Sequence, residues 1–123
     1  MQVLYLGIFG ALGCVSRYLV SGWIYSLFGR ALPSGTLGVN LIGSFLLGVL
    51  MEGSLRSTLL SPELRIGLTV GFMGGFTTFS TFSYETVRLL EDGSLIAAGA
   101  NILLNVTVCV LAAALGIYLA RQW

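Results

Sequence analysis

The stretch of sequence that decides the fold of this protein is GFMGGFTTFSTFSYE, residues 71–85. All of it except Glu85 lies in an uncharged run, residues 66–84, that is long enough to cross a bilayer. Yet it contains what a plain spanning helix avoids, namely glycines that loosen the backbone and serine and threonine hydroxyls beside them. Non-helical backbone at membrane depth occurs only where it is buried in protein or lines a wet cavity. We therefore predict a helix broken near its centre and a functional role for this segment.

The composition is that of an integral membrane protein. The chain has 123 residues, of which 56% are hydrophobic and 9% charged, and its mean hydropathy is +0.95. A soluble domain of this size needs more polar surface. The net charge of +1 gives no reason to expect a nucleic acid or an acidic partner. Cys14 and Cys109 fall in apolar segments without nearby disulfide or metal partners, so we interpret them as small buried hydrophobic residues.

Four apolar segments predict an all-α protein with four transmembrane helices in a single membrane domain, residues 1–123. Turn residues and charges separate the expected spans, which are residues 3–27, 36–52, 66–84 and 95–120. The first segment is too long and too rich in glycine for a cleaved signal peptide, so we interpret it as a retained span. Its glycines at 7, 10 and 13 recur at helical spacing and favour close packing of another backbone.

The distribution of arginines gives almost no preference for one orientation of the chain in the membrane. With four spans, Arg56, Arg65 and Arg121 lie on one side of the membrane, whereas Arg30 and Arg88 lie on the other. Orientation follows the excess of basic residues in short loops, and here the excess is one. The chain is therefore expected to insert both ways. Small-residue helix faces predict an oligomer, which we expect to be a dimer. If both orientations occur, the dimer could be antiparallel.

Polar residues inside the spans leave two interpretations open. Asn40, Asn101 and Asn105 could be interhelical hydrogen-bonding residues, worth about 1 kcal/mol each, or their NH₂ groups could line an ion route. Arg17 either extends to the membrane interface or lies at an aqueous vestibule where it attracts anions. The spacing of Phe79 and Phe82 is typical of packing, although the partly positive ring edges could hold a small anion.

Residues 71–85 resemble the signature of the Fluc (CrcB) family of fluoride channels. Residues 10–18 and 35–44 and the Asn101/Asn105 pair resemble the first, second and fourth helices of that family, so the resemblance covers essentially the whole chain. It implies a dual-topology antiparallel homodimer in the bacterial plasma (inner) membrane. It further implies two passive pores, each formed from both subunits, that export cytoplasmic fluoride and so protect the cell from its toxicity.

The resemblance also implies roles for particular residues. Phe79 and Phe82 would turn ring edges toward fluoride, and Asn40 would supply an amide donor in the pore. A polar track beside them would contain Ser80, Thr81, Asn101 and Asn105, although some family members have tyrosine and serine where this chain has the last two. Arg17 would lie toward the vestibule, and a structural sodium ion would bind at the two-fold axis to the backbone carbonyls of Gly74 and Thr77.

Physical reasoning supports a passive anion route. An inside-negative potential favours the exit of an anion by about 2.3 kcal/mol per 100 mV, so no energy source is needed. The chain lacks the Gly-Lys-Ser/Thr ending of a phosphate loop and has no histidine, so no enzyme chemistry is expected. Two alternatives stay open. A drug/proton antiporter would need an acid buried in a span, and a non-transporting membrane subunit would leave the clustered hydroxyls unexplained.

Overall fold

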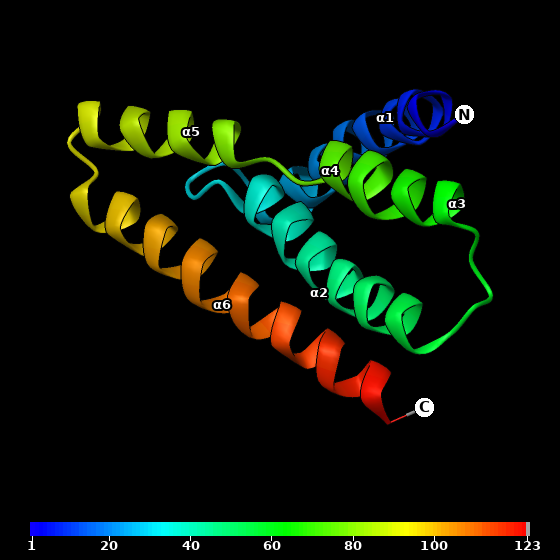
Figure 1. Ribbon diagram of the computed structural model, residues 1–123. Coiled ribbons are helices and arrows are strands. Elements are labelled where there is room, and N and C mark those ends of the chain that lie inside the picture. Colours follow the sequence, from blue (N-terminus) through cyan, green and yellow to red (C-terminus); the bar gives the residue numbers. More distant parts are fainter. Residues whose placement is uncertain (123) are drawn as a thin grey trace.

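The computed structural model describes residues 1–122, and within that range every regular element is a helix. Three long helices form most of the molecule: α1 (Gln2–Phe28), α2 (Ser34–Arg56) and α6 (Leu95–Arg121). Each of the three is long and apolar enough to cross a membrane. In Figure 1, α1 begins and α6 ends at the same end of the molecule. The prediction of an all-helical chain with membrane spans is therefore confirmed.

The third expected span, residues 66–84, is divided among shorter helices. A first rod contains α3 (Pro62–Ile66), the π-helix η1 (Gly67–Phe72) and α4 (Met73–Phe76), and α5 (Phe79–Glu91) follows after two extended residues. Figure 1 shows the first rod and α5 extending to opposite sides of this break. No single one of these pieces is long enough to cross a bilayer. The fourth crossing therefore stays a prediction.

Side chains at the break explain why the helix stops there. Thr77 and Thr78 have extended ψ angles of 159° and 119°. The Thr77 hydroxyl donates back to the carbonyl of Met73 at 2.9 Å, whereas the Thr78 hydroxyl accepts from the N–H of Thr81 at 3.2 Å. The second bond is an N-cap, which satisfies one of the free N–H groups in the first turn of α5. The hydroxyls noted in the sequence thus end one helix and begin the next.

Close backbone packing joins α2 to α6. A Cβ added at Gly48 of α2 would overlap the carbonyl oxygen of Ala113, and one added at Gly116 of α6 would overlap that of Phe45. The two helices therefore approach each other where neither has a side chain, as small-residue interfaces in membranes allow. This contact lies about two turns from Asn40 on α2 and about three turns from Asn105 on α6, so it helps to set the distance between these two amides.

On α1, only part of the predicted glycine strip packs against another backbone. A Cβ at Gly13 would overlap the carbonyl of Phe72, and one at Gly75 of α4 would lie 2.7 Å from the carbonyl oxygen of Gly10. At Gly7 an added Cβ would meet no atom within 4 Å. The glycines nearer the break therefore hold α1 against η1 and α4, whereas Gly7 lies on an open surface.

The outer surface of the chain is apolar. Val39, Met73 and Phe76 form a small buried hydrophobic cluster, whereas large apolar side chains such as Val3 (81% exposed) and Ile96 (90% exposed) point outward. A soluble monomer rarely exposes so much apolar surface. Helix α2 continues to Arg56, past the end expected at residue 52, and an ion pair of 2.9 Å between Arg121 and Glu52 joins α6 to α2. The fold is that of a protein solvated by lipid.

Candidate functional site

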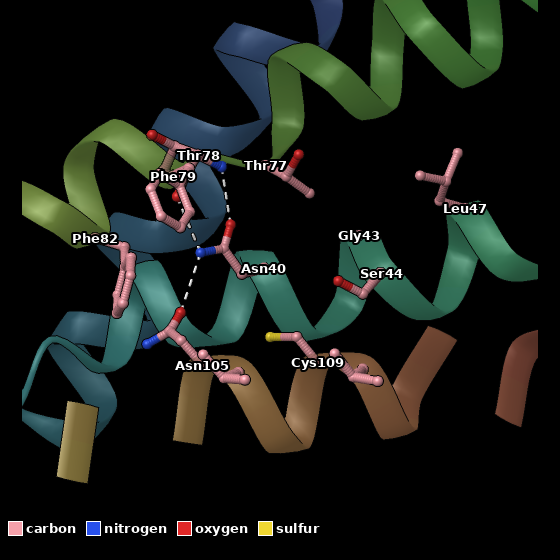
Figure 2. Close-up of a pocket in the computed structure, with 12 residues that line it drawn as sticks. Asn40, Gly43, Ser44, Leu47, Thr77, Thr78, Phe79, Phe82, Asn105 and Cys109 are labelled. Carbon is pink, nitrogen blue, oxygen red and sulfur yellow. Dashed lines mark hydrogen bonds between the residues drawn. The ribbon is translucent and has the colours of Figure 1, made fainter. Parts of the chain in front are cut away.

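A cleft of about 340 Å³ lies where α2, α5, α6 and the break meet (Figure 2). Its wall combines two phenylalanine rings with a set of polar side chains. The residues on it that carry polar atoms are Asn40, Ser44, Thr77, Thr78, Asn105 and Cys109. The rest of the wall consists of Gly43 and the aliphatic side chains of Leu47, Val106 and Val110. Hydrogen-bonding groups in an otherwise apolar cleft are typical of a site for a small ligand.

Asn40 holds the break by pairing with both backbone groups of Thr78. Its Nδ2 donates to the Thr78 carbonyl oxygen at 3.0 Å, and its Oδ1 accepts from the Thr78 N–H at 2.8 Å. Figure 2 shows this pair facing the break from α2. Extended residues at a helix break lose their intrahelical hydrogen bonds, and buried backbone groups without partners cost free energy. The amide of Asn40 therefore supplies the bonds that the helix no longer makes.

The two asparagines of α6 join this pair through further hydrogen bonds. Asn40 Nδ2 also donates to Asn105 Oδ1 at 3.2 Å (Figure 2). Asn105 Nδ2 donates to the Oδ1 and the backbone carbonyl of Asn101, at 3.0 and 2.9 Å. Asn101 is fully buried and outside the cleft wall, and its Nδ2 donates to the hydroxyl of Thr86 on α5 at 2.9 Å. The structure thus brings the predicted asparagines together, with Asn40 and Asn105 lining the cleft and Asn101 behind them.

Phe79 and Phe82 meet in the cleft but differ in exposure. Their ring centroids are 5.3 Å apart and their planes are inclined by 57°. Phe82 is 7% exposed, whereas Phe79 is 77% exposed and lies beside the extended residues. Both rings line the cleft with Asn40 (Figure 2). The third phenylalanine of the motif, Phe76, is buried in the core with Phe72 stacked on it, so it serves packing.

Arg17 and Thr81 line a second cavity of about 300 Å³, separate from the phenylalanine cleft except that Thr78 borders both. Arg17 is half-buried, and its Nε donates to the carbonyl oxygen of Gly75 at 3.0 Å. A cation at the carbonyl end of a helix is favourable because of the helix dipole. Ser80 is exposed beside Thr78, with the two hydroxyl oxygens 3.3 Å apart. Of the predicted polar track, Thr81 therefore borders a different space from Asn105, and Ser80 lines neither cavity.

Glu85 also lines this second cavity, and no role was predicted for it from the sequence. The carboxylate accepts hydrogen bonds from the Tyr25 hydroxyl at 2.8 Å and from the Thr36 hydroxyl. Arg30 lines the same cavity, with its guanidinium carbon 4.6 Å from the centre of the Tyr25 ring. The only available signal was the position of Glu85 at the end of the motif. Its partners are 60 and 49 residues away in sequence, beyond the reach of local spacing rules.

The predicted sodium ligands lie on either side of the helix end. Gly74 is exposed, and a Cβ there would meet no atom within 4 Å. The N–H of Thr78, which an uninterrupted helix would direct to the Gly74 carbonyl, is bonded to Asn40 instead. Among residues 1–122 there is no cluster of three or more His, Cys, Asp or Glu side chains that could hold a metal ion. The sodium site at the carbonyl oxygens of Gly74 and Thr77 therefore stays a prediction.

The family model described as CrcB-like protein, Camphor Resistance (CrcB), matches residues 4–117. The chain belongs to the CrcB-like family. Its similarity to curated relatives extends over nearly the full length of both chains. A protein of Syntrophotalea carbinolica is 73% identical over 122 residues, covering 99% of each chain, and one of Geotalea uraniireducens is 63% identical over 119 residues, covering 97% of this chain and 96% of the relative. Both relatives are named fluoride-specific ion channel FluC.

A third relative, from Geobacter sulfurreducens, has the same name and is 58% identical over 120 residues, covering 98% of this chain and 97% of the relative. The resemblance inferred from residues 71–85 is confirmed by these matches. Membership of the CrcB-like family, together with three helices able to span a bilayer, also confirms the expected location in the bacterial plasma membrane as a multi-pass protein.

Proposed function

We propose that this CrcB-like protein is a fluoride-selective passive channel, not an enzyme, that lets cytoplasmic fluoride leave the cell. The observation that carries the proposal is the cleft in which the amides of Asn40 and Asn105 face the rings of Phe79 and Phe82. An anion needs N–H, O–H or ring-edge donors, and this wall offers them without a basic side chain that would hold the ion too tightly to release. The names of the close relatives support fluoride as the ion.

Asn40 is the proposed donor, and its present partners indicate how an anion would gain access to it. Both N–H groups of its Nδ2 are used, one on the Thr78 carbonyl and one on Asn105 Oδ1. The bond to Asn105 is the longest of the amide contacts at 3.2 Å, and both side chains border the cleft. Fluoride would replace Asn105 Oδ1 as the acceptor while the Thr78 pair keeps Asn40 in position. One weak hydrogen bond is then exchanged for a charge-assisted one.

Ring edges would complete the coordination and supply the selectivity. Phe82 is buried against the cleft, so its ring orientation is held by packing. A partly dehydrated fluoride ion would gain the positive edge of the ring and the amide N–H at once. Chloride is larger and would not fit a passage of the same width. The membrane potential then drives exit by about 2.3 kcal/mol per 100 mV without any coupled ion.

The proposed channel is an antiparallel homodimer with two pores. Phe79 lies at the break within the expected third span, yet its side chain is 77% exposed in a single chain. A second subunit would cover this exposed ring. The near-equal number of arginines on the two sides supports insertion in both orientations. A second copy would bring its own phenylalanines to the open side of the cleft.

A structural sodium ion at the two-fold axis is proposed from the residues at the helix end. The Gly74 carbonyl is released from its helical bond because Thr78 N–H is taken by Asn40, and the extended Thr77 presents its own carbonyl outside the helix. Carbonyl oxygens suit hard cations. Two carbonyl oxygens from each subunit would bind the ion, and the ion would thereby link the broken helices of the two subunits. Ion replacement with an anomalous scatterer in crystals of the dimer is expected to give a peak between the subunits, and a flat map there would refute the site.

The function is tested by anion efflux from liposomes that contain the purified protein. Potassium and valinomycin set the voltage, and ion-selective electrodes compare fluoride with chloride. We expect rapid fluoride loss without chloride loss and without any effect of a proton gradient. Half-buried Glu85 makes a proton-coupled carrier the second candidate, and it would instead give efflux that follows the proton gradient. Absence of efflux from folded dimers would refute both candidates and favour a non-transporting subunit.

A further inference from the structure

The three asparagines of the chain all lie in one continuous set of hydrogen bonds, which we call the amide series. It begins at Thr86 on α5, passes through Asn101 and Asn105 on α6 and Asn40 on α2, and ends at the backbone of Thr78. Each amide donates with its nitrogen to the preceding member and accepts with its oxygen from the following one. The amide series therefore has a single direction across three helices.

Thr86 determines that direction at the buried end. Its hydroxyl has one hydrogen, which it donates to the carbonyl of Phe82 at 2.8 Å. The hydroxyl oxygen can then only accept, so the group of Asn101 that faces it must be the NH₂. Asn101 is fully buried and Thr86 is 7% exposed, so water cannot take the place of either partner. The oxygen of Asn101 is thereby turned toward Asn105.

The backbone of Thr78 fixes the same direction at the other end. Its N–H and carbonyl lie at set positions in the break, and Asn40 satisfies both only with Oδ1 on the N–H and Nδ2 on the carbonyl. The second N–H of Asn40 then faces Asn105, which must present oxygen. Were Asn105 reversed, two NH₂ groups would face each other and a buried donor would lack an acceptor, at a cost of about 1–3 kcal/mol.

We propose that Thr86 and Asn101 are positioning residues that hold Asn105 with its oxygen toward the N–H that Asn40 presents in the cleft. The proposal rests on the proposed function, in which the N–H that Asn40 directs to Asn105 is the one that receives fluoride. Neither Thr86 nor Asn101 lines the cleft, so both act without touching the ion. Their role differs from that implied for Asn101 by the family resemblance, because a fully buried amide whose nitrogen and oxygen are both hydrogen-bonded within the protein is a poor ligand for a passing anion.

Thr86→Val is the variant that separates these roles, since valine has the shape of threonine but cannot accept a hydrogen bond. The NH₂ of Asn101 would lose its acceptor and turn away, and Asn105 would lose the partner that orients it from α6. Asn40 would stay paired with Thr78, but its hydrogen bond to Asn105 would change. Thr86→Ser keeps the acceptor. Thr69→Val is a matched control, because Thr69 is also 7% exposed and also donates to a carbonyl four residues back, that of Arg65, at 2.8 Å, but makes no contact with the amide series.

The direct readout is NMR of the reconstituted full-length protein labelled with ¹⁵N on asparagine side chains. Only three NH₂ groups are then observed, one for each asparagine. Thr86→Val is expected to shift the resonances of Asn40, three hydrogen bonds away, whereas Thr86→Ser and Thr69→Val leave them in place. An unshifted Asn40 resonance in folded Thr86→Val would overturn the proposal. This readout requires no conduction, so it is independent of the proposed function.

The second readout is the fluoride efflux rate of the same preparations. Thr86→Val is expected to lower it about fivefold, the ratio that corresponds to one hydrogen bond of ordinary strength. Thr86→Ser and Thr69→Val should stay within twofold of the unsubstituted protein. A shifted Asn40 resonance with an unchanged efflux rate would overturn the positioning role. Failure of the unsubstituted protein to conduct fluoride would refute the proposed function, while the NMR comparison would still decide whether Thr86 acts on Asn40 through the amide series.

Discussion

Replacing Asn40 by aspartate tests the proposed donor with almost no change in shape. In Asn40→Asp the oxygen that accepts from the Thr78 N–H is kept, but the donating nitrogen becomes a second oxygen. This oxygen would face two other acceptors, the Thr78 carbonyl at 3.0 Å and Asn105 Oδ1 at 3.2 Å. Two hydrogen bonds are lost, at about 0.5–1.5 kcal/mol each. We therefore expect the free energy of unfolding to fall by about 2 kcal/mol.

The effect of Asn40→Asp on conduction should be larger than its effect on stability. A carboxylate about 4 Å from a fluoride ion raises the energy of that ion by about 4 kcal/mol at an effective dielectric constant of about 20. At tenfold per 1.4 kcal/mol, this lowers the occupancy of the site by between two and three orders of magnitude. Fluoride efflux from liposomes, measured with a fluoride electrode under voltage clamp, should fall to the background of empty vesicles.

Gln122→Glu is the matched control, because it makes the same amide-to-carboxylate change at the exposed end of α6. It should conduct like the unsubstituted protein. Size-exclusion chromatography and an unfolding curve would establish that Asn40→Asp is folded before its efflux is compared. Efflux by folded Asn40→Asp at the unsubstituted rate would refute the reasoning, because no anion could then depend on the Asn40 N–H group.

Three other substitutions test different parts of the site. Phe79→Ile with Phe82→Ile keeps an apolar wall but removes the ring edges, so fluoride efflux should fall at least about tenfold in a dimer that stays folded; the unsubstituted rate in the purified double variant would rule out the role of the rings. Arg17→Lys keeps the charge but loses the Nε that holds α4, so the free energy of unfolding should fall by about 1–2 kcal/mol, and an unchanged denaturation midpoint would mean that this bond is dispensable. Gly48→Ala places a methyl group against a carbonyl of α6 and should cost about 1–3 kcal/mol in the same assay, whereas Gly7→Ala, on an open surface, should cost far less; equal costs would contradict direct backbone packing at Gly48.

The sequence predicted the membrane class and the helical segments because hydropathy and helix length are local properties. Charges, prolines and glycines separate the apolar runs, so α1 and α6 lie within two residues of their expected ends. The clustered hydroxyls of residues 77–83 lie where α4 ends and α5 begins. Spacing by four residues correctly put Asn101 and Asn105 on one face of a helix, since such residues are neighbours on its surface.

What each polar side chain contacts could not be predicted from such spacing. Asn40 and Thr78 are 38 residues apart, and their pairing depends on how closely α2 approaches the break. The same packing buries Asn101 against Thr86 while leaving Asn105 on the cleft wall, although the two asparagines occupy equivalent positions one turn apart on α6. Local pattern therefore identified the asparagines and the family, through the motif of residues 71–85. Only the tertiary structure determined which amide faces the cleft and which one orients it, because hydrogen bonds require atoms within about 3 Å and helix packing alone sets those distances.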